Sequence, residues 1–385
     1  MSDFWIVLSL FILFPVIVTF YIIFYYFYKR KNSKYLLQDY SKLIPSDASY
    51  EFVGHENLMA LSGKMGHKQA AKFKSNIQSL YLVHGTFVGE DPWHIIELLG
   101  SVLPEQAESF IDKLKLATKH GQSLVAKDNG NFTQKHISIL NKLFKSEVKV
   151  KEFTWSSGNH HYARVKGMLD LARELAISHE KGDRILLIGH SHAAQLFALL
   201  TKLISNNEFK NLILKFFSEE ISRDELVRVI KRCRTFYFDI VTLGSPPRYT
   251  WELSADIKLL HFINHRSKDV LGGTYHGAMT TKDGDYIQQW GIAGSDFISP
   301  IEKQRRINKE LDQYFGPGAD RAHFKEQIKY RKRLHNKGHH FLVDYGDQSR
   351  FPNFLKTLFG HGVYTRTELL QFHLELIYDF LYFKK

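Results

Sequence analysis

A chain of 385 residues is long enough for one large α/β domain with additional segments. Its single cysteine, Cys233, excludes a disulfide framework and fits a reducing compartment. It also leaves no Cys-x-x-Cys pair, so a zinc site is not expected. The formal net charge is +12, but no nucleic-acid-binding motif accompanies it, and no nucleic-acid partner is expected.

The first 34 residues predict a membrane anchor. No charged residue occurs from Phe4 to Tyr28, and a helix of that length exceeds the roughly 30 Å core of a bilayer. Tyrosines gather at the end that meets the basic residues 29–34, as in an interfacial aromatic belt. The start, residues 1–3, lacks the basic region of a signal peptide, so the segment is expected to remain. The basic flank places the domain on the cytoplasmic side of a single-pass membrane protein.

Residues 35–77 are expected to form a polar connector or the outer edge of the domain, which spans residues 78–385. Strands are predicted to alternate with helices along the domain, which favours a mostly parallel sheet. The first predicted segments are a buried strand at Leu80–Val83 that ends in the turn His84-Gly85-Thr86, a helical region at 91–145, a strand at 148–153 and a crossover helix at 161–180.

The most informative segment follows the crossover helix. A buried strand, Ile185–Ile188, ends at Gly189, and an apolar-periodic helix begins almost at once. Ser191 lies in Gly189-His190-Ser191-His192-Ala193, where a sharp strand-to-helix turn exposes a hydroxyl and aims amide groups at developing charge. Glycine is usual at the last position, but alanine is also small. The alternative is an ordinary turn in which Ser191 caps the helix.

A serine nucleophile needs a histidine base and a carboxylate that orients it. Where the serine lies in such a strand-to-helix turn, the acid is expected after it in the chain and the histidine last. A predicted strand at Leu259–Ile263 leads into a loop with Asp269, at the sheet edge where open α/β sheets place their chemistry. Asp239 is the alternative acid, but it lies at the start of its own strand. We therefore expect Asp269 to orient the base.

The histidine between two glycines, His361, is the candidate base. It lies between a last strand near 339–345 and a final amphipathic helix near 367–383, in what is expected to be an exposed, mobile loop. The alternative bases are His335, His339 and His340. The backbone N–H groups of Thr86 and His192 are assigned to the oxyanion hole.

Two helical insertions are expected. Residues 199–233 are rich in apolar side chains and form either a cap over the site or an extension of the helical layer. Residues 301–337 carry eleven basic and five acidic residues, a net charge of 11 − 5 = +6. This segment is either a solvated helical pair or a basic face that lies on anionic lipid.

Together these segments resemble the α/β-hydrolases of the lipase and esterase type over residues 78–383. The likeness is carried by His84-Gly85-Thr86, Phe153–Asn159, Gly189–Ala193, Thr242–Pro246, Asn264 with Asp269, and His361. The resemblance implies a mostly parallel sheet with helices on both faces, and hydrolysis of carboxylic esters, often lipids, without a cofactor.

The sequence therefore predicts a membrane-anchored serine hydrolase that cleaves an acyl ester, with a lipid or phospholipid as the expected substrate. Ser191 attacks, His361 transfers the proton, and Asp269 orients His361. An acyltransferase or thioesterase with the same three residues is one alternative. An interaction protein that has the fold without catalysis is another. Acyl chain length, head group and oligomeric state are left open.

Overall fold

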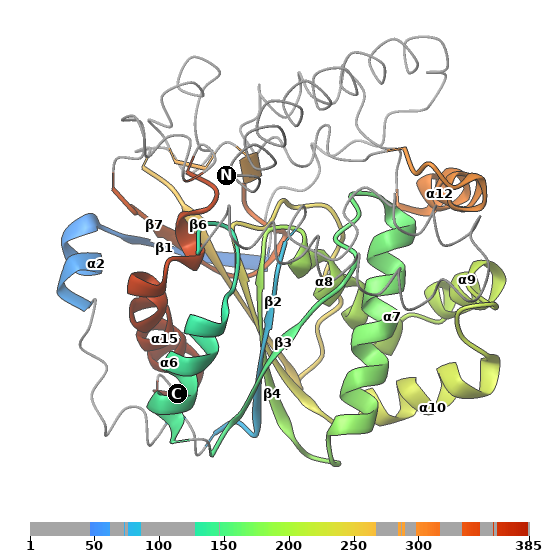
Figure 1. The fold of residues 1–385 in the computed structure, drawn as a ribbon, viewed down its shortest axis with the longest axis horizontal. Helices are drawn as coiled ribbons and strands as arrows, with labels where there is room; N and C mark the ends of the chain where they lie inside the picture. Colours follow the sequence, from blue (N-terminus) through green and yellow to red (C-terminus); the bar gives the residue numbers. More distant parts are fainter. Residues whose placement is uncertain are drawn as a thin grey trace, which may run out of the picture.

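The computed structural model describes residues 47–61, 73, 76–85, 128–145, 147–266, 284–285, 287–288, 298–315, 333–346, 357 and 360–383. Their strands form one seven-stranded sheet in the order β1-β7-β6-β5-β4-β2-β3, and every pairing is parallel (Figure 1). The strands are β1 (Asp47–Val53), β2 (Ser79–Val83), β3 (Lys149–Phe153), β4 (Arg184–His190), β5 (Tyr237–Leu243), β6 (Ile257–Asn264) and β7 (Lys337–Val343). The predicted α/β class with a parallel sheet is confirmed.

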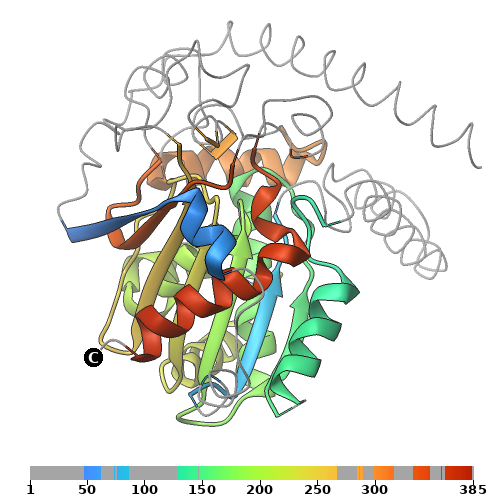
Figure 2. The same ribbon diagram turned by 90° about the vertical axis from the view of Figure 1, so that its left-hand side faces the viewer.

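Helices cover both faces of the sheet. The helices are α2 (His55–Leu61), α6 (Gln134–Phe144), α7 (His161–Ser178), α8 (Ala193–Ser205), α9 (Asn207–Phe216), α10 (Arg223–Cys233), α12 (Glu302–Phe315) and α15 (Leu370–Tyr378), which continues as a π-helical turn, Asp379–Phe383. Helices α7 to α10 and α12 lie on one face, and α6 and α15 lie on the other (Figures 1 and 2).

The interior strand β4 explains why both faces must be covered. Ile185 and Leu187 point into the core beneath α7 and α8, whereas Leu186 and Ile188 point into the core beneath α6 and α15. Alternation along a strand sends successive side chains to opposite faces, so a continuous apolar run demands two layers of helices. Each fully buried side chain of this kind contributes about 1.5–3 kcal/mol.

Strand β1 lies inside residues 35–77, which were expected to form a polar connector or the outer edge of the domain, and it is an edge strand of the sheet. It pairs with β7 along its whole length, from Asp47 opposite Lys337 to Val53 opposite Val343. As an edge strand it leaves Tyr50 and Phe52 about half exposed. No strand was predicted here, because an edge strand lacks the continuous apolar run of a strand buried on both faces.

The first insertion extends the helical layer. Buried residues of α9 and α10, among them Phe209, Ile213 and Leu226, join the core formed by α7 and α8. Helix α10 lies along the half of α7 that leads away from Ser191, where Arg173 pairs with Glu225 at 2.7 Å. This position favours the predicted layer extension over a cap.

The second insertion is described at residues 301–315, which contain α12, and at residues 333–337. Its buried face, Ile307, Leu311 and Phe315, packs into the core against α7. Its outer face exposes Arg305, Arg306 and other polar residues. Residues 316–332 of the predicted basic segment lie outside the described residues, and residues 333–337 lead into β7.

The predicted membrane anchor, residues 1–34, also lies outside the described residues. In the parts of the chain that are described, no helix combines the length and apolar character that a membrane crossing requires.

Three histidines, His261, His335 and His340, form a buried stack between β6 and β7. The ring of His261 lies 4.1 Å from that of His335 and 4.5 Å from that of His340, between centroids. Each ring donates one N–H to a backbone carbonyl, those of Lys337, Ser245 and Ser49 respectively. Each accepts at its other nitrogen, from the Thr242 hydroxyl, the Trp251 indole and the His335 backbone N–H respectively. This pattern fixes three neutral tautomers.

Acid is expected to destabilise the fold through this stack. Burial lowers the pKa of His335 to about 3 and that of His340 to about 4, and burial with its neighbouring rings lowers the pKa of His261. Unfolded histidines titrate near pH 6.5, so below about pH 6.5 the unfolded chain binds more protons and stability falls. Urea unfolding should show a lower free energy of unfolding at pH 5 than at pH 7.

The variant His335→Gln separates the stack from other acid-sensitive groups. Glutamine offers one donor and one acceptor but gains no proton, so this variant should lose less stability than the parent between pH 7 and pH 5. Equal losses in the two proteins would contradict the contribution of His335.

Candidate active site

Ser191 lies in a strained turn between β4 and α8. Its φ is +56°, in the left-handed region that side chains other than glycine rarely adopt. Its N–H donates to the carbonyl of Leu243 at 2.8 Å, which ties the turn to the end of the neighbouring strand β5. A Cβ added at Gly189 would lie 2.6 Å from the Phe197 ring, so strand and helix cross as closely as the sequence pattern predicted.

His361 connects this hydroxyl to a carboxylate. Its Nε2 lies 2.8 Å from Ser191 Oγ, and its Nδ1 lies 2.7 Å from Asp285 Oδ2. A carboxylate only accepts, so Nδ1 carries the hydrogen, and in the neutral imidazole Nε2 accepts from the serine hydroxyl. The arrangement is that of a serine, a general base and an orienting acid.

The acid in this arrangement is Asp285, whereas Asp269 was the residue predicted for this role. Both aspartates follow β6 in the sequence, and Asp269 lies outside the described residues. The single Nδ1 hydrogen of His361 is directed to Asp285. The alternative, Asp239, is fully buried within β5 and is bonded to Arg184 and Tyr382.

At Gly284 the chain lies beside the end of β6 again, which brings Asp285 to His361. Gly284, at φ +109°, forms an antiparallel bridge with His265, and the N–H of Asp285 donates to the carbonyl of Asn264 at 2.9 Å. The sequence does contain a signal at this point. The residues Asp283-Gly284-Asp285 are a combination typical of a tight turn.

Asp285 is buried and still ionised. Burial alone would raise its pKa, but the charge of His361, hydrogen bonds from His361 and the N–H of Gln288, and the charge of Arg333 together lower it. The Gln288 N–H lies 2.8 Å from Oδ1. Tyr364 donates to Oδ2 at 2.9 Å. A buried carboxylate with several donors is a competent partner for a histidine that must become positively charged.

The loop that carries His361 is held at several points, and His361 is only 5% exposed, so the prediction of an exposed loop is wrong. Its backbone is bonded on both sides, with the N–H of Gly362 donating to Thr357 and the N–H of Gly130 donating to Gly362. His190 donates its Nε2–H to the carbonyl of His361 at 3.0 Å, and burial lowers the pKa of His190 to about 3. The neutral His190 therefore positions the base.

The turn at the end of β2 lies against Ser191. A Cβ added at Gly85 would lie 2.7 Å from the Cβ of Ser191. The turn is fixed by the preceding histidine, whose Nδ1–H donates to the Gly85 carbonyl at 3.0 Å. Trp155 also holds this turn in place, because its indole N–H donates to the His84 carbonyl at 2.9 Å.

The proposed oxyanion donors are described only in part. Thr86 lies outside the described residues, and its role stays a prediction. His192 is the N-cap residue of α8, so its N–H lies at the positive end of the helix dipole. Its role as a donor also stays a prediction.

The alternative bases lie elsewhere. His335 and His340 belong to the buried stack between β6 and β7. His339 is bonded to Ser49 Oγ at 2.7 Å and stacks on Phe380. Their hydrogen bonds join them to other groups, and His361 is the histidine bonded to Ser191.

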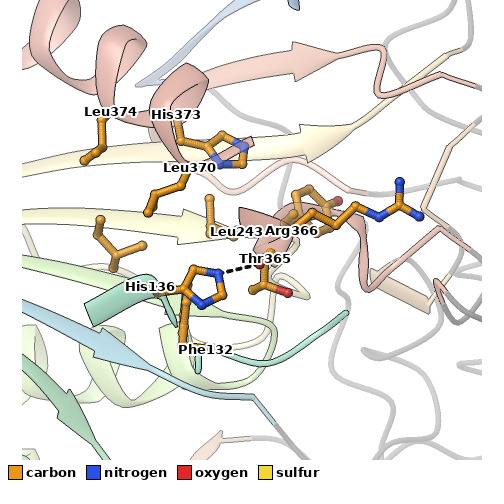
Figure 3. Close-up of a pocket in the computed structure, with 10 residues that line it drawn as sticks. Phe132, His136, Leu243, Thr365, Arg366, Leu370, His373 and Leu374 are labelled. Carbon is orange, nitrogen blue, oxygen red and sulfur yellow. Dashed lines mark hydrogen bonds between the residues drawn. The ribbon is translucent and has the colours of Figure 1, made fainter. Parts of the chain in front are cut away.

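A small cavity of about 10 Å³ lies between β4, β5 and α15 (Figure 3). His136 and Thr365 in its wall are joined by a hydrogen bond from the imidazole to the Thr365 carbonyl, at 2.6 Å. The cavity has room for about one water molecule, and neither Ser191 nor His361 lines it. It is therefore a packing feature beside the site.

Within the described residues, no group of three or more His, Cys, Asp and Glu side chains is arranged to hold a metal ion. Comparisons with family models, curated proteins and solved structures found no match for this chain.

The strain at Ser191 can be measured directly by unfolding. Ser191→Gly and Ser191→Ala both remove the hydroxyl, but only alanine keeps the Cβ that disfavours a positive φ. We expect the glycine variant to be more stable than the alanine variant by about 0.5–1 kcal/mol in urea unfolding. The opposite order would mean that the turn is not strained.

Proposed function

We propose that this protein is a serine hydrolase of carboxylic esters with the α/β-hydrolase fold. The observation that carries the proposal is the continuous path from Ser191 Oγ through His361 to Asp285, with contacts of 2.8 Å and 2.7 Å. A histidine bonded to the serine hydroxyl and an aspartate bonded to that histidine are the two partners that acyl transfer by a serine requires. The aligned groups disfavour the alternative of a fold without catalysis.

The sheet topology supports the proposed position of the site. Strands β2 and β4 are neighbours, but β2 leads toward α6 on one face and β4 leads directly into α8 on the other. Such a change of direction opens a crevice at the carboxyl ends of the two strands, where α/β proteins bind their ligands. Gly85 and Ser191 lie at these two ends.

The proposed mechanism uses each group in turn. Ser191 attacks the ester carbonyl while Nε2 of His361 takes its proton, and Asp285 stabilises the resulting imidazolium. The N–H groups of Thr86 and His192 hold the oxyanion. His361 then protonates the leaving alcohol, and water attacks the acyl-enzyme to release the acid and restore Ser191.

The proposed substrate is the acyl ester of a lipid, and the proposed location is a membrane. The uncharged segment Phe4–Tyr28 and its basic flank support both, since an anchor would hold the catalytic domain beside its substrate on the cytoplasmic side.

Turnover of 4-nitrophenyl acyl esters tests the proposed activity. The parent should release acid and alcohol, and Ser191→Ala should lower kcat by about 10³-fold or more. Product analysis with an added alcohol or thiol distinguishes transfer to water from transfer to another acceptor. Equal turnover by Ser191→Ala and the parent would refute the assignment.

Asp269 and Asp285, the two aspartates considered for the role of the acid, give a matched pair of variants. Asp285→Asn should reduce kcat by about 10³–10⁴-fold, because an amide cannot hold the Nδ1–H tautomer or stabilise the imidazolium. Asp269→Asn should keep activity within a few-fold of the parent. Steady-state kinetics compares them, and the reverse order would return the role to Asp269.

Membrane association of the full-length protein is a separate prediction. The parent should stay in the membrane pellet after an alkaline carbonate wash. A charge at the centre of the anchor, Ile17→Arg, costs about 2.5–3.5 kcal/mol of insertion free energy and should shift protein to the supernatant. Lys34→Arg is the control, since it keeps the flank charge. Complete extraction of the parent would refute the anchor.

A further inference from the structure

We infer that Tyr364 is a positioning residue that sets the basicity of His361 through Asp285. This inference rests on the proposed function, because it concerns the same serine, histidine and aspartate. It adds a fourth side chain that the sequence analysis did not single out.

The geometry gives Asp285 Oδ2 two donors. His361 Nδ1 lies 2.7 Å away and the Tyr364 hydroxyl lies 2.9 Å away. The hydroxyl oxygen itself accepts the backbone N–H of Asn264 at 2.8 Å, so its own hydrogen is available for a carboxylate. Its alternative acceptor, Gln288 Oε1, is more distant, at 3.5 Å.

The position of the Tyr364 ring is tightly constrained. The ring passes so close to Gly244 that an added Cβ would lie 2.3 Å from it. Gly244 adopts φ +60°, which glycine alone adopts without strain. Burial, together with the charge of Asp285, raises the pKa of Tyr364 well above its usual value, so the hydroxyl remains a donor.

Two donors on one oxygen compete for the same negative charge. The bond from Tyr364 stabilises the carboxylate, and it also weakens the attraction of Asp285 for a proton on His361. Without this bond the imidazolium gains a stronger partner, and His361 becomes more basic. Loss of the Tyr364 hydroxyl is therefore expected to strengthen the interaction of Asp285 with a protonated His361.

Other ionisable groups surround the pair and remain in one state over the range of interest. His190 is neutral, since burial lowers its pKa to about 3, and Arg333 stays positively charged. Burial also raises the pKa of Tyr345 well above its usual value. A change in pH profile after removal of the Tyr364 hydroxyl can therefore be assigned to His361.

Tyr345 provides a matched control. It is fully buried, its ring contacts that of Tyr364 at 5.3 Å between centroids, and its hydroxyl is hydrogen-bonded to His373 at 2.7 Å. Tyr345→Phe removes a buried hydroxyl from the same cluster but leaves Asp285 with all its donors.

The experiment compares Tyr364→Phe and Tyr345→Phe in the full-length protein. The rate constant for labelling by a fluorophosphonate, which reacts with an activated serine, is measured from pH 5 to 9. In Tyr364→Phe, the apparent pKa of the rise in labelling rate should increase by about 0.5–1 unit. The plateau above that rise should stay within a few-fold of the parent.

The profile of Tyr345→Phe should keep the parental midpoint. An equal fall in rate at every pH in Tyr364→Phe would overturn the inference, because it would indicate a purely structural role. An equal shift in both variants would also overturn it.

A second measurement separates this inference from the proposed function. The His361 imidazole is titrated by NMR in Ser191→Ala and in the double variant Ser191→Ala/Tyr364→Phe, with His361→Gln used to assign the signal. A higher His361 pKa in the double variant supports the inference even where no ester is cleaved. Unchanged titration refutes it even where the parent hydrolyses esters.

Discussion

The backbone of Ser191 is the constraint on which the site depends. A residue other than glycine at φ +56° is unfavourable, and the turn is held by the bond to Leu243 and by the close crossing of Gly189 and Phe197. This conformation directs the hydroxyl toward His361 instead of into a regular helix. The strain is offset by the two cores that bury β4 from both faces.

The groups that position His361 are held near the carboxyl ends of strands β4 and β6. Asn264, at the end of β6, holds Asp285 with its carbonyl and Tyr364 with its N–H. The residue before Ser191, His190, also contributes, because it donates a hydrogen bond to the backbone carbonyl of His361. The base is therefore positioned by several fixed groups at once, which is the kind of preorganisation that acyl transfer exploits.

Features that depend on a local sequence pattern could be predicted from the sequence. Features that depend on contacts between residues far apart in the chain could not. The sharp turn around Ser191 was recognisable from the sequence, and so was the histidine between two glycines, because the backbone geometry requires small residues at both places. Asp285 was not, since periodicity cannot tell which of the aspartates that follow β6 in the sequence lies beside the end of that strand. Strand β1 was missed because an edge strand carries a weak apolar signal. The burial of His361 was also missed, because it comes from contacts with distant residues such as Gly130.

The most direct test of the account is where a fluorophosphonate attaches to the full-length protein. Peptide mass spectrometry should find one phosphonyl group per chain, on the peptide that contains Ser191, and none after Ser191→Ala. An unlabelled parent, or an adduct that persists unchanged in Ser191→Ala, would show that this hydroxyl is not an activated nucleophile.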